Sequence, residues 1–194
     1  LTADVLASGD GNDILDGRSG NDVLLGGAGG DILTGGTGRD RIDGGAGYDF
    51  VSYRTAKAGV RVDLNAPAAN LGDALGDTLI GVEGLQGSNH ADVLTSDLSD
   101  NFLDGLSGND RIYSYDGNDT LVGGVGDDGL YGMNGNDFFR GGAGKDFIHG
   151  GAGVDMALYD DSPTALRVDL LVPAINTGIA AGDALGGVEG IRGR

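Results

Sequence analysis

Residues 123–158 read GGVGDDGLY, GMNGNDFFR, GGAGKDFIH and GGAGVDMAL, four segments of nine residues in unbroken succession. Positions 1, 2 and 4 of each segment are glycine except at Met133, position 6 is Asp, and position 8 is large and apolar except at Ala157. The same nonapeptide, with more substitutions, fills residues 1–52 and 87–122. A fixed period of this kind indicates a repeat architecture.

Positions 1–6 of the nonapeptide predict a turn, and positions 7–9 predict a short strand. Glycine is needed where φ is positive or where two backbones approach closely. Side chains alternate along a strand, so position 8 faces the core and positions 7 and 9 face outward. A three-residue strand has no stability alone, whereas strands stacked at ~4.8 Å bury a continuous column of position-8 side chains. With two nonapeptides per coil, the sequence predicts an all-β, right-handed parallel β-roll, a type of β-helix or solenoid.

The position-6 aspartates are the predicted metal ligands. Each faces the Asp eighteen residues away on the next coil, and two carboxylates held so close repel by about 1 to 4 kcal/mol at effective dielectric constants of 80 to 20. A cation between them is required, and Asp and carbonyl oxygens suit Ca²⁺ better than Mg²⁺. This pairing predicts up to four sites in the first block and up to six in the second. The ligands are Asp4, Asp13, Asp22, Asp31, Asp40, Asp49, Asp92, Asp110, Asp119, Asp128, Asp137, Asp146 and Asp155.

The start of the second block departs from the nonapeptide. Position 6 is the neutral Asn101, position 4 is His90 in the preceding repeat, and serine or aspartate replaces turn glycines at Ser96, Asp97 and Ser99. We therefore expect the sites at Asp92 and Asn101 to be the weakest of the series. Asp97 and Asp100 could compensate there as additional oxygen ligands.

Composition limits the possible functions. The formal charge of −18 excludes a nucleic-acid-binding protein, which needs a basic surface. Of the 30 acidic residues only Glu83 and Glu189 are Glu, and this preference for the shorter acid favours metal ligation in tight turns. With no Cys and two His, zinc and iron sites are poorly supplied. No apolar run is long enough to span a membrane, and no signal peptide is visible.

We expect this chain to be a piece of a larger parent chain. The piece itself is expected to have four parts. These are a first roll block (1–52), a connector or cap (53–86), a second roll block (87–158) and a second connector (159–194). The connectors align at an offset of 106 residues without a gap, as Val62 with Val168 and Pro67 with Pro173 show. Four connector acids are either additional calcium ligands or turn caps, namely Asp63, Asp77, Asp169 and Asp183.

The nonapeptide resembles the RTX, or haemolysin-type, calcium-binding repeat. The whole arrangement is also similar to the R-modules of mannuronan C5-epimerases and to like segments of exported bacterial proteins. The resemblance implies a secreted, extracellular or cell-surface protein, export by a one-step type I system, and folding that waits for extracellular calcium. It also implies that carbonyl oxygens of turn glycines hold the ions. The glycines are Gly27, Gly29, Gly36, Gly38, Gly45, Gly47, Gly124, Gly126, Gly142, Gly144, Gly151 and Gly153.

One outward face could bind a partner. Positions 7 and 9 of one sheet place Tyr113, Tyr131 and His149 in a ladder, which either stacks on sugar rings or stabilises the sheet by cross-strand packing. No catalytic dyad can be assembled, so we expect this chain to be non-catalytic. The first hypothesis is a calcium-binding module, with about ten ions, that drives folding after secretion and stabilises or spaces an attached effector. The alternative is attachment of a parent enzyme or adhesin to an acidic, alginate-like polysaccharide.

Overall fold

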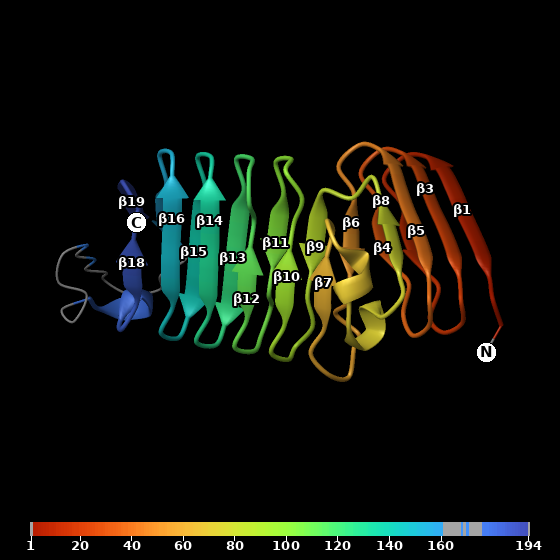
Figure 1. Ribbon diagram of the computed structural model, residues 1–194, viewed down its shortest axis with the longest axis horizontal. Coiled ribbons are helices and arrows are strands. Elements are labelled where there is room, and N and C mark those ends of the chain that lie inside the picture. The colour runs from red at the N-terminus through yellow and green to blue at the C-terminus, as the bar shows by residue number, and fades with distance from the viewer. Residues whose placement is uncertain (1, 161–167, 169, 171–175, 194) are drawn as a thin grey trace.

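The computed structural model describes residues 2–160, 168, 170 and 176–193. Its strands form an elongated solenoid in which successive coils lie side by side along the long axis, with the two chain ends at opposite ends of the stack (Figure 1). Within the described residues every pair of neighbouring strands is parallel, from β1–β3 to β17–β19. The predicted all-β parallel β-roll is therefore confirmed.

The strands of the described residues belong to three sheets. The four-stranded sheet contains β1 (Val5–Asp10), β3 (Val23–Ala28), β5 (Arg41–Ala46) and β8 (Thr78–Ile80). The six-stranded sheet contains β7 (Arg61–Asp63), β10 (Val93–Thr95), β12 (Arg111–Tyr113), β14 (Gly129–Asn134), β16 (Phe147–Ala152) and β18 (Ala184–Gly186). The nine-stranded sheet contains β2 (Ile14–Asp16), β4 (Ile32–Thr34), β6 (Phe50–Ser52), β9 (Gly84–Gln86), β11 (Phe102–Asp104), β13 (Thr120–Val125), β15 (Phe138–Ala143), β17 (Met156–Tyr159) and β19 (Gly190–Gly193).

The register follows the eighteen-residue coil predicted from the sequence. Leu24 pairs with Ile42, and Leu121 pairs with Phe139, so each position-8 side chain lies beside its equivalent two repeats away. Several strands are longer than the three residues expected. In β3 the strand continues through Gly26 and Gly27 to Ala28, because the first three turn positions also pair in register, as Gly27 does with Gly45.

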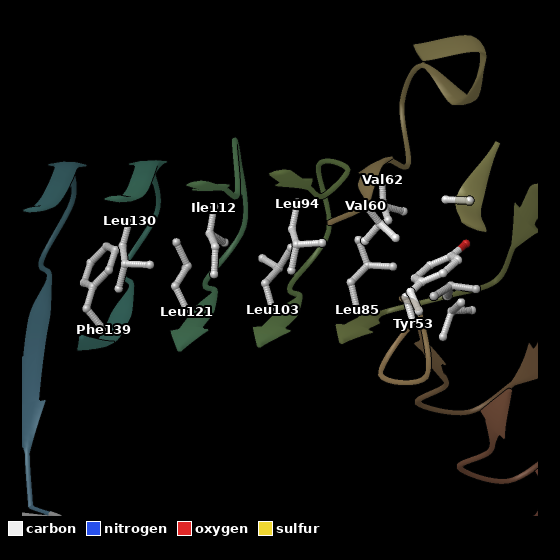
Figure 2. Close-up of a cluster of buried hydrophobic side chains, with 14 of the residues drawn as sticks. Tyr53, Val60, Val62, Leu85, Leu94, Leu103, Ile112, Leu121, Leu130 and Phe139 are labelled. Carbon is white, nitrogen blue, oxygen red and sulfur yellow. The ribbon is translucent and has the colours of Figure 1, made fainter. Parts of the chain in front are cut away.

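The core is a single column of position-8 side chains enclosed between the facing sheets (Figure 2). These side chains have 0 % exposure at nearly every coil, and in Figure 2 those of Leu94 and Leu103, or Ile112 and Leu121, point inward toward each other from opposite sides. Each fully buried aliphatic side chain contributes about 1.5–3 kcal/mol of hydrophobic free energy. A continuous apolar column, rather than any one strand, therefore holds the coils together.

The first connector is built into the roll. Its strand β8 ends the four-stranded sheet beside β5, and its strand β7 begins the six-stranded sheet beside β10. Strand β9 lies between β6 and β11, so the nine-stranded sheet runs through both blocks without a break. Two short 3-10 helices, η1 (Pro67–Ala69) and η2 (Gly72–Ala74), lie in the connector, and η4 (Gly178–Ala180) is the counterpart of η2 in the second connector. No helix in the described part of the chain is long and apolar enough to cross a membrane.

Candidate metal sites

The turns present a stack of carbonyl oxygens. At positions 2 and 4 of a typical turn φ is positive, as at Gly142 (φ 100) and Gly144 (φ 148). A Cβ on Gly142 would overlap the carbonyl oxygen of Gly124, and one on Gly144 would overlap that of Gly126. Only glycine combines this backbone conformation with so close an approach. All the predicted ligand glycines share both features, namely Gly27, Gly29, Gly36, Gly38, Gly45, Gly47, Gly124, Gly126, Gly142, Gly144, Gly151 and Gly153.

Each position-6 carboxylate is fixed by the neighbouring coil. The backbone N–H of Asp13 donates to Oδ1 of Asp31 at 2.8 Å, and that of Asp119 donates to Oδ1 of Asp137 at 2.9 Å, each across eighteen residues. The second carboxylate oxygen, Oδ2, has no such donor in most of these aspartates. Among the described residues, ten aspartates each have a buried Oδ2 with no hydrogen-bond partner, namely Asp22, Asp31, Asp40, Asp49, Asp110, Asp119, Asp128, Asp137, Asp146 and Asp155.

Backbone oxygens converge with these unpaired carboxylate oxygens. A Cβ on Gly26, at position 1, would overlap both Oδ2 of Asp31 and the carbonyl oxygen of Gly44 on the next coil. The same arrangement recurs at Gly132, beside Asp137 and Gly150. The carbonyl oxygen of Gly126, at position 4, accepts no hydrogen bond from the described residues. A glycine turn of this kind therefore offers a carboxylate oxygen and a carbonyl oxygen that lack donors.

Burial makes these carboxylates costly to ionise without a partner. Burial raises the pKa of Asp110, Asp119 and Asp146 to about 7, and that of Asp137 to about 6. A buried negative charge needs a cation or several hydrogen-bond donors. Within the described chain no group of three or more His, Cys, Asp or Glu side chains could hold a metal. A cation here would depend on backbone carbonyls as much as on Asp, and such an all-oxygen set suits Ca²⁺.

The predicted aspartates differ in their surroundings. Asp4 and Asp13 belong to the first coil, where Asp4 is exposed and Asp13 is partly exposed. Asp92 is buried, but its carboxylate accepts hydrogen bonds from Ser88. Asn101 is also buried, and its amide donates to the carbonyl oxygen of Glu83. Asp92 therefore has donors for both carboxylate oxygens, whereas Asn101 has a partner for its Nδ2 but none for its buried, uncharged Oδ1.

Connector acids complete the aspartate columns, and the spacing of eighteen did not reveal them. Asp40 donates its N–H to Oδ1 of Asp77, and Asp49 donates to Oε2 of Glu83. In the second connector, Asp183 Oδ1 accepts the N–H of Asp146, and Glu189 Oε2 accepts the N–H of Asp155. The sequence signal is an acid two residues before a core residue, as in Asp77-Thr78-Leu79 and Glu83-Gly84-Leu85. Asp63 instead caps a turn through the N–H groups of Asn65 and Ala66, and Asp169 lies outside the described residues.

Position 5 carries a second ladder that sequence reasoning missed. Asn118 Oδ1 accepts the N–H of Asn136 at 3.1 Å, and Asn136 Oδ1 accepts the N–H of Val154 at 2.8 Å. The same bond joins Asn12 to Gly30, Asn21 to Arg39, Asp100 to Asn118, Asn109 to Asp127 and Asp127 to Lys145. The frequent Asn or Asp at position 5 was the available signal. These side chains satisfy turn N–H groups on the outside of the roll, next to the aspartate columns.

On the aromatic face, two of the three residues of the predicted ladder stack directly, and the third contacts a different ring. Tyr113 and Tyr131 stack with ring centroids 4.8 Å apart and planes 12° apart. His149 contacts Phe147 at 6.5 Å, and Phe147 in turn contacts Tyr131 at 5.6 Å. Beside Tyr113 lies an open cavity of about 420 Å³, lined by Arg61, Asp63, Val93, Thr95, Arg111, Tyr113, Tyr115 and Met133.

A comparison of the sequence with known protein families identifies the same nine-residue repeat. The RTX calcium-binding nonapeptide repeat matches four times, at residues 2–33, 16–51, 95–130 and 122–157, which together cover more than half of the chain. The chain therefore belongs to this family of calcium-binding repeats, found in exported bacterial proteins that are typically secreted. The repeat is a non-catalytic structural unit, and no catalytic family is indicated. A search of curated proteins finds no match to the chain.

Proposed function

We propose that the chain is a calcium-loaded β-roll that folds after type I export and stabilises or spaces an attached effector. The observation that carries this proposal is the set of ten buried aspartate oxygens without a partner, most of which lie near a backbone carbonyl oxygen of the next coil. One ion per unpaired oxygen gives about ten Ca²⁺, whose combined charge of about +20 would balance the formal charge of −18 and leave the assembly near neutral. The division into two blocks and two connectors, at residues 52, 86 and 158, is part of the proposal.

The same oxygens couple calcium to folding. In the unfolded chain these carboxylates and carbonyls are hydrated, so the binding site exists only when two coils are stacked. Extracellular calcium modules have Kd values of about 10⁻⁴ to 10⁻³ M, far weaker than cytosolic calcium buffers. Sites of that affinity are empty inside a cell and filled outside it. Calcium would therefore delay folding until export is complete.

A calcium titration followed by far-UV circular dichroism tests this function. We expect little strand signal in EGTA and a cooperative gain at millimolar Ca²⁺, with Mg²⁺ much less effective. Asp128→Asn removes an unpaired oxygen and should raise the calcium midpoint. Asp127→Asn is the matched control, because it removes the same charge while the new amide oxygen can still accept the N–H of Lys145 in place of Asp127 Oδ1. A signal unaffected by calcium, or equal midpoints for the two variants, would contradict the proposal.

A second function, attachment to an acidic polysaccharide, is favoured by the stacked pair of Tyr113 and Tyr131. Tyr113 lines the cavity that Arg61 and Arg111 also line, and Tyr131 stacks on Tyr113, in a protein with only twelve Lys and Arg residues. Aromatic faces pack on sugar rings, and guanidinium groups bind carboxylates in pairs of hydrogen bonds. This surface therefore combines the two groups that a uronate sugar needs.

Calorimetry of the calcium-loaded chain with alginate oligomers tests attachment. Saturable binding that Tyr131→Ala and Arg111→Ala weaken would support it. Tyr48→Ala is the control, because Tyr48 is an exposed aromatic whose ring contacts Phe50 of the nine-stranded sheet instead. If the oligomers do not bind, or if Tyr48→Ala weakens binding as much, the attachment function is wrong and folding with spacing remains.

A further inference from the structure

Two turns of the roll have a different backbone from all the others. In the turns of residues 87–92 and 96–101, positions 2 and 4 are Ser88 with His90 and Asp97 with Ser99. None of these four residues is among the residues with positive φ. Every other nonapeptide turn from residue 8 to residue 155 has positive φ at both positions, even where position 2 is Arg18, Leu106, Tyr115 or Met133. The carbonyl groups of these two turns are therefore not presented as in the rest of the stack.

The first of these turns satisfies its own carboxylate. Oδ2 of Asp92 accepts the N–H of Ser88 at 2.6 Å, and Oδ1 accepts the Ser88 hydroxyl at 2.9 Å and the N–H of Val60 at 2.7 Å. The next aspartates of the same column, Asp110 and Asp128, have an Oδ2 without a partner. Ser88 supplies the donors that these carboxylates lack. A charged carboxylate with three donors is stable in a buried place without a metal.

The second turn replaces a carboxylate with an amide. Asn101 Nδ2 donates to the carbonyl oxygen of Glu83 at 3.2 Å, and its buried Oδ1 has no hydrogen-bond partner but carries no charge. The Ser96 hydroxyl donates to the carbonyl oxygen of Ser114 at 2.6 Å. The two acids that could compensate each use Oδ1 as the acceptor for a turn N–H group, and neither stands at position 6. Asp97 Oδ1 accepts the N–H of Ser99 at 2.9 Å, and Asp100 Oδ1 accepts the N–H of Asn118 at 2.7 Å. This turn has no ionised position-6 ligand to offer.

We propose that residues 87–104, with their two turns, form a metal-free joint in the roll. Serine and asparagine donors there take the place of calcium, and the ions load two separate groups of sites on either side. The unpaired aspartate oxygens divide in this way, with Asp22, Asp31, Asp40 and Asp49 before the joint and the other six after it. This inference rests on the proposed function for the remaining turns.

The first connector gives the joint a core of its own. Strand β7 pairs with β10 of the joint, and Asn65 Nδ2 donates to the carbonyl oxygen of Ser96 at 2.7 Å. Tyr53 has 1 % exposure, and its hydroxyl donates to Oδ2 of Asp77 at 3.0 Å. These contacts are hydrophobic packing and hydrogen bonds, which need no ion. The joint and connector are therefore expected to keep their structure when calcium is removed and to serve as the template on which both blocks fold.

Counting bound ions by native mass spectrometry tests the joint directly. Asp128→Asn should lose one Ca²⁺ relative to the wild-type chain, and Asp92→Asn should lose none. The loss of one ion in Asp92→Asn overturns the inference and leaves the proposed function intact. If the wild-type chain itself retains no calcium, the proposed function is wrong. A second measurement then decides whether residues 87–104 form a joint that is structured without metal.

Hydrogen exchange of the wild-type chain in EGTA is that second measurement, and it needs no variant. Amides of residues 60–64 and 87–104 should exchange at least tenfold more slowly than those of residues 123–158. In calcium this difference should shrink as the blocks become protected. Uniformly fast exchange in EGTA overturns the inference, because it would mean that the joint needs ions elsewhere in the roll to keep its structure.

Discussion

The turn of residues 123–128 and the turn of residues 87–92 occupy the same column of the roll, yet their carboxylates are satisfied differently. Oδ2 of Asp128 has no partner beside Gly123, whereas Oδ2 of Asp92 accepts the N–H of Ser88. Both turns nevertheless deliver a core leucine, Leu130 or Leu94, at 0 % exposure. The strand and its buried side chain are thus the same with either kind of turn.

This comparison indicates what the ion contributes. A Ser at position 2 brings a hydroxyl and an ordinary φ, so the turn closes on itself but presents no carbonyl stack. A Gly at positions 2 and 4 allows close approach between coils, and the approach leaves oxygen atoms facing one another. Facing oxygens repel, so such turns need a cation to be stable. We infer that calcium dependence is a property of individual turns and not of the solenoid fold.

Core truncations should separate the two regions most strongly. Leu94→Ala and Leu121→Ala each remove a side chain with 0 % exposure and should each cost about 2–5 kcal/mol of unfolding free energy in calcium. In EGTA only Leu94→Ala should reduce the remaining far-UV signal, because the Leu121 region is already unfolded. Urea unfolding in calcium and circular dichroism in EGTA measure the two effects. Equal losses of EGTA signal would remove the distinction between the regions.

Acidity should act in opposite directions with and without calcium. Burial raises the pKa of Asp110, Asp119 and Asp146 to about 7, above the ordinary value of an unfolded chain. The metal-free folded form therefore binds extra protons, so in EGTA its stability is greatest at acid pH and is lost as the pH rises through about 7. In calcium, protons compete with the ion for the same carboxylates. The calcium midpoint should rise as the pH falls from 7 to 5, by up to about tenfold per pH unit for each carboxylate that must lose a proton.

Calcium titrations at pH 5, 6, 7 and 8, with a matched series in EGTA, measure this dependence. We expect the chain to gain structure in EGTA at pH 5 and to bind calcium more weakly at that pH. A midpoint independent of pH would show that these carboxylates are not the calcium ligands.

The repeat explains why the fold could be predicted from the sequence and why parts of the sites could not. The spacing of Leu121, Leu130 and Phe139 fixed the coil length, and the coil length placed Asp110 next to Asp128. Asp77 and Glu83 break the spacing of eighteen, since a connector of different length separates them from Asp40 and Asp49. Only the three-dimensional closure of the last coil brings those acids together. The donor role of Ser88 likewise depends on a backbone conformation that its identity alone does not determine.

Removal of a position-5 side chain should have a moderate effect that is independent of calcium ligation. Asn118→Ala deletes the acceptor for both the backbone N–H and the side-chain amide of Asn136. It should lower the free energy of unfolding by about 1 kcal/mol. Asn118→Asp keeps the acceptor, as the natural Asp127 does at the same position, and should cost less. Urea unfolding in calcium gives the cost, and native mass spectrometry should find the ion count unchanged. A lost ion in Asn118→Ala would instead make position 5 part of the metal site.

Glycine substitutions at position 2 should give the smallest effects, with opposite signs in the two regions. Met133 has φ 72, a left-handed conformation that costs a non-glycine residue about 1–2 kcal/mol. Glycine relieves this strain but loses more backbone entropy on folding, so Met133→Gly should stabilise the calcium-loaded chain by up to about 1 kcal/mol. Asp97 has no positive φ, and its side chain accepts the N–H of Ser99, so Asp97→Gly should destabilise by about 1 kcal/mol. Urea midpoints in calcium measure both changes. If both substitutions stabilise the chain, the two turns share one backbone conformation, and the difference on which the metal-free joint depends does not exist in solution.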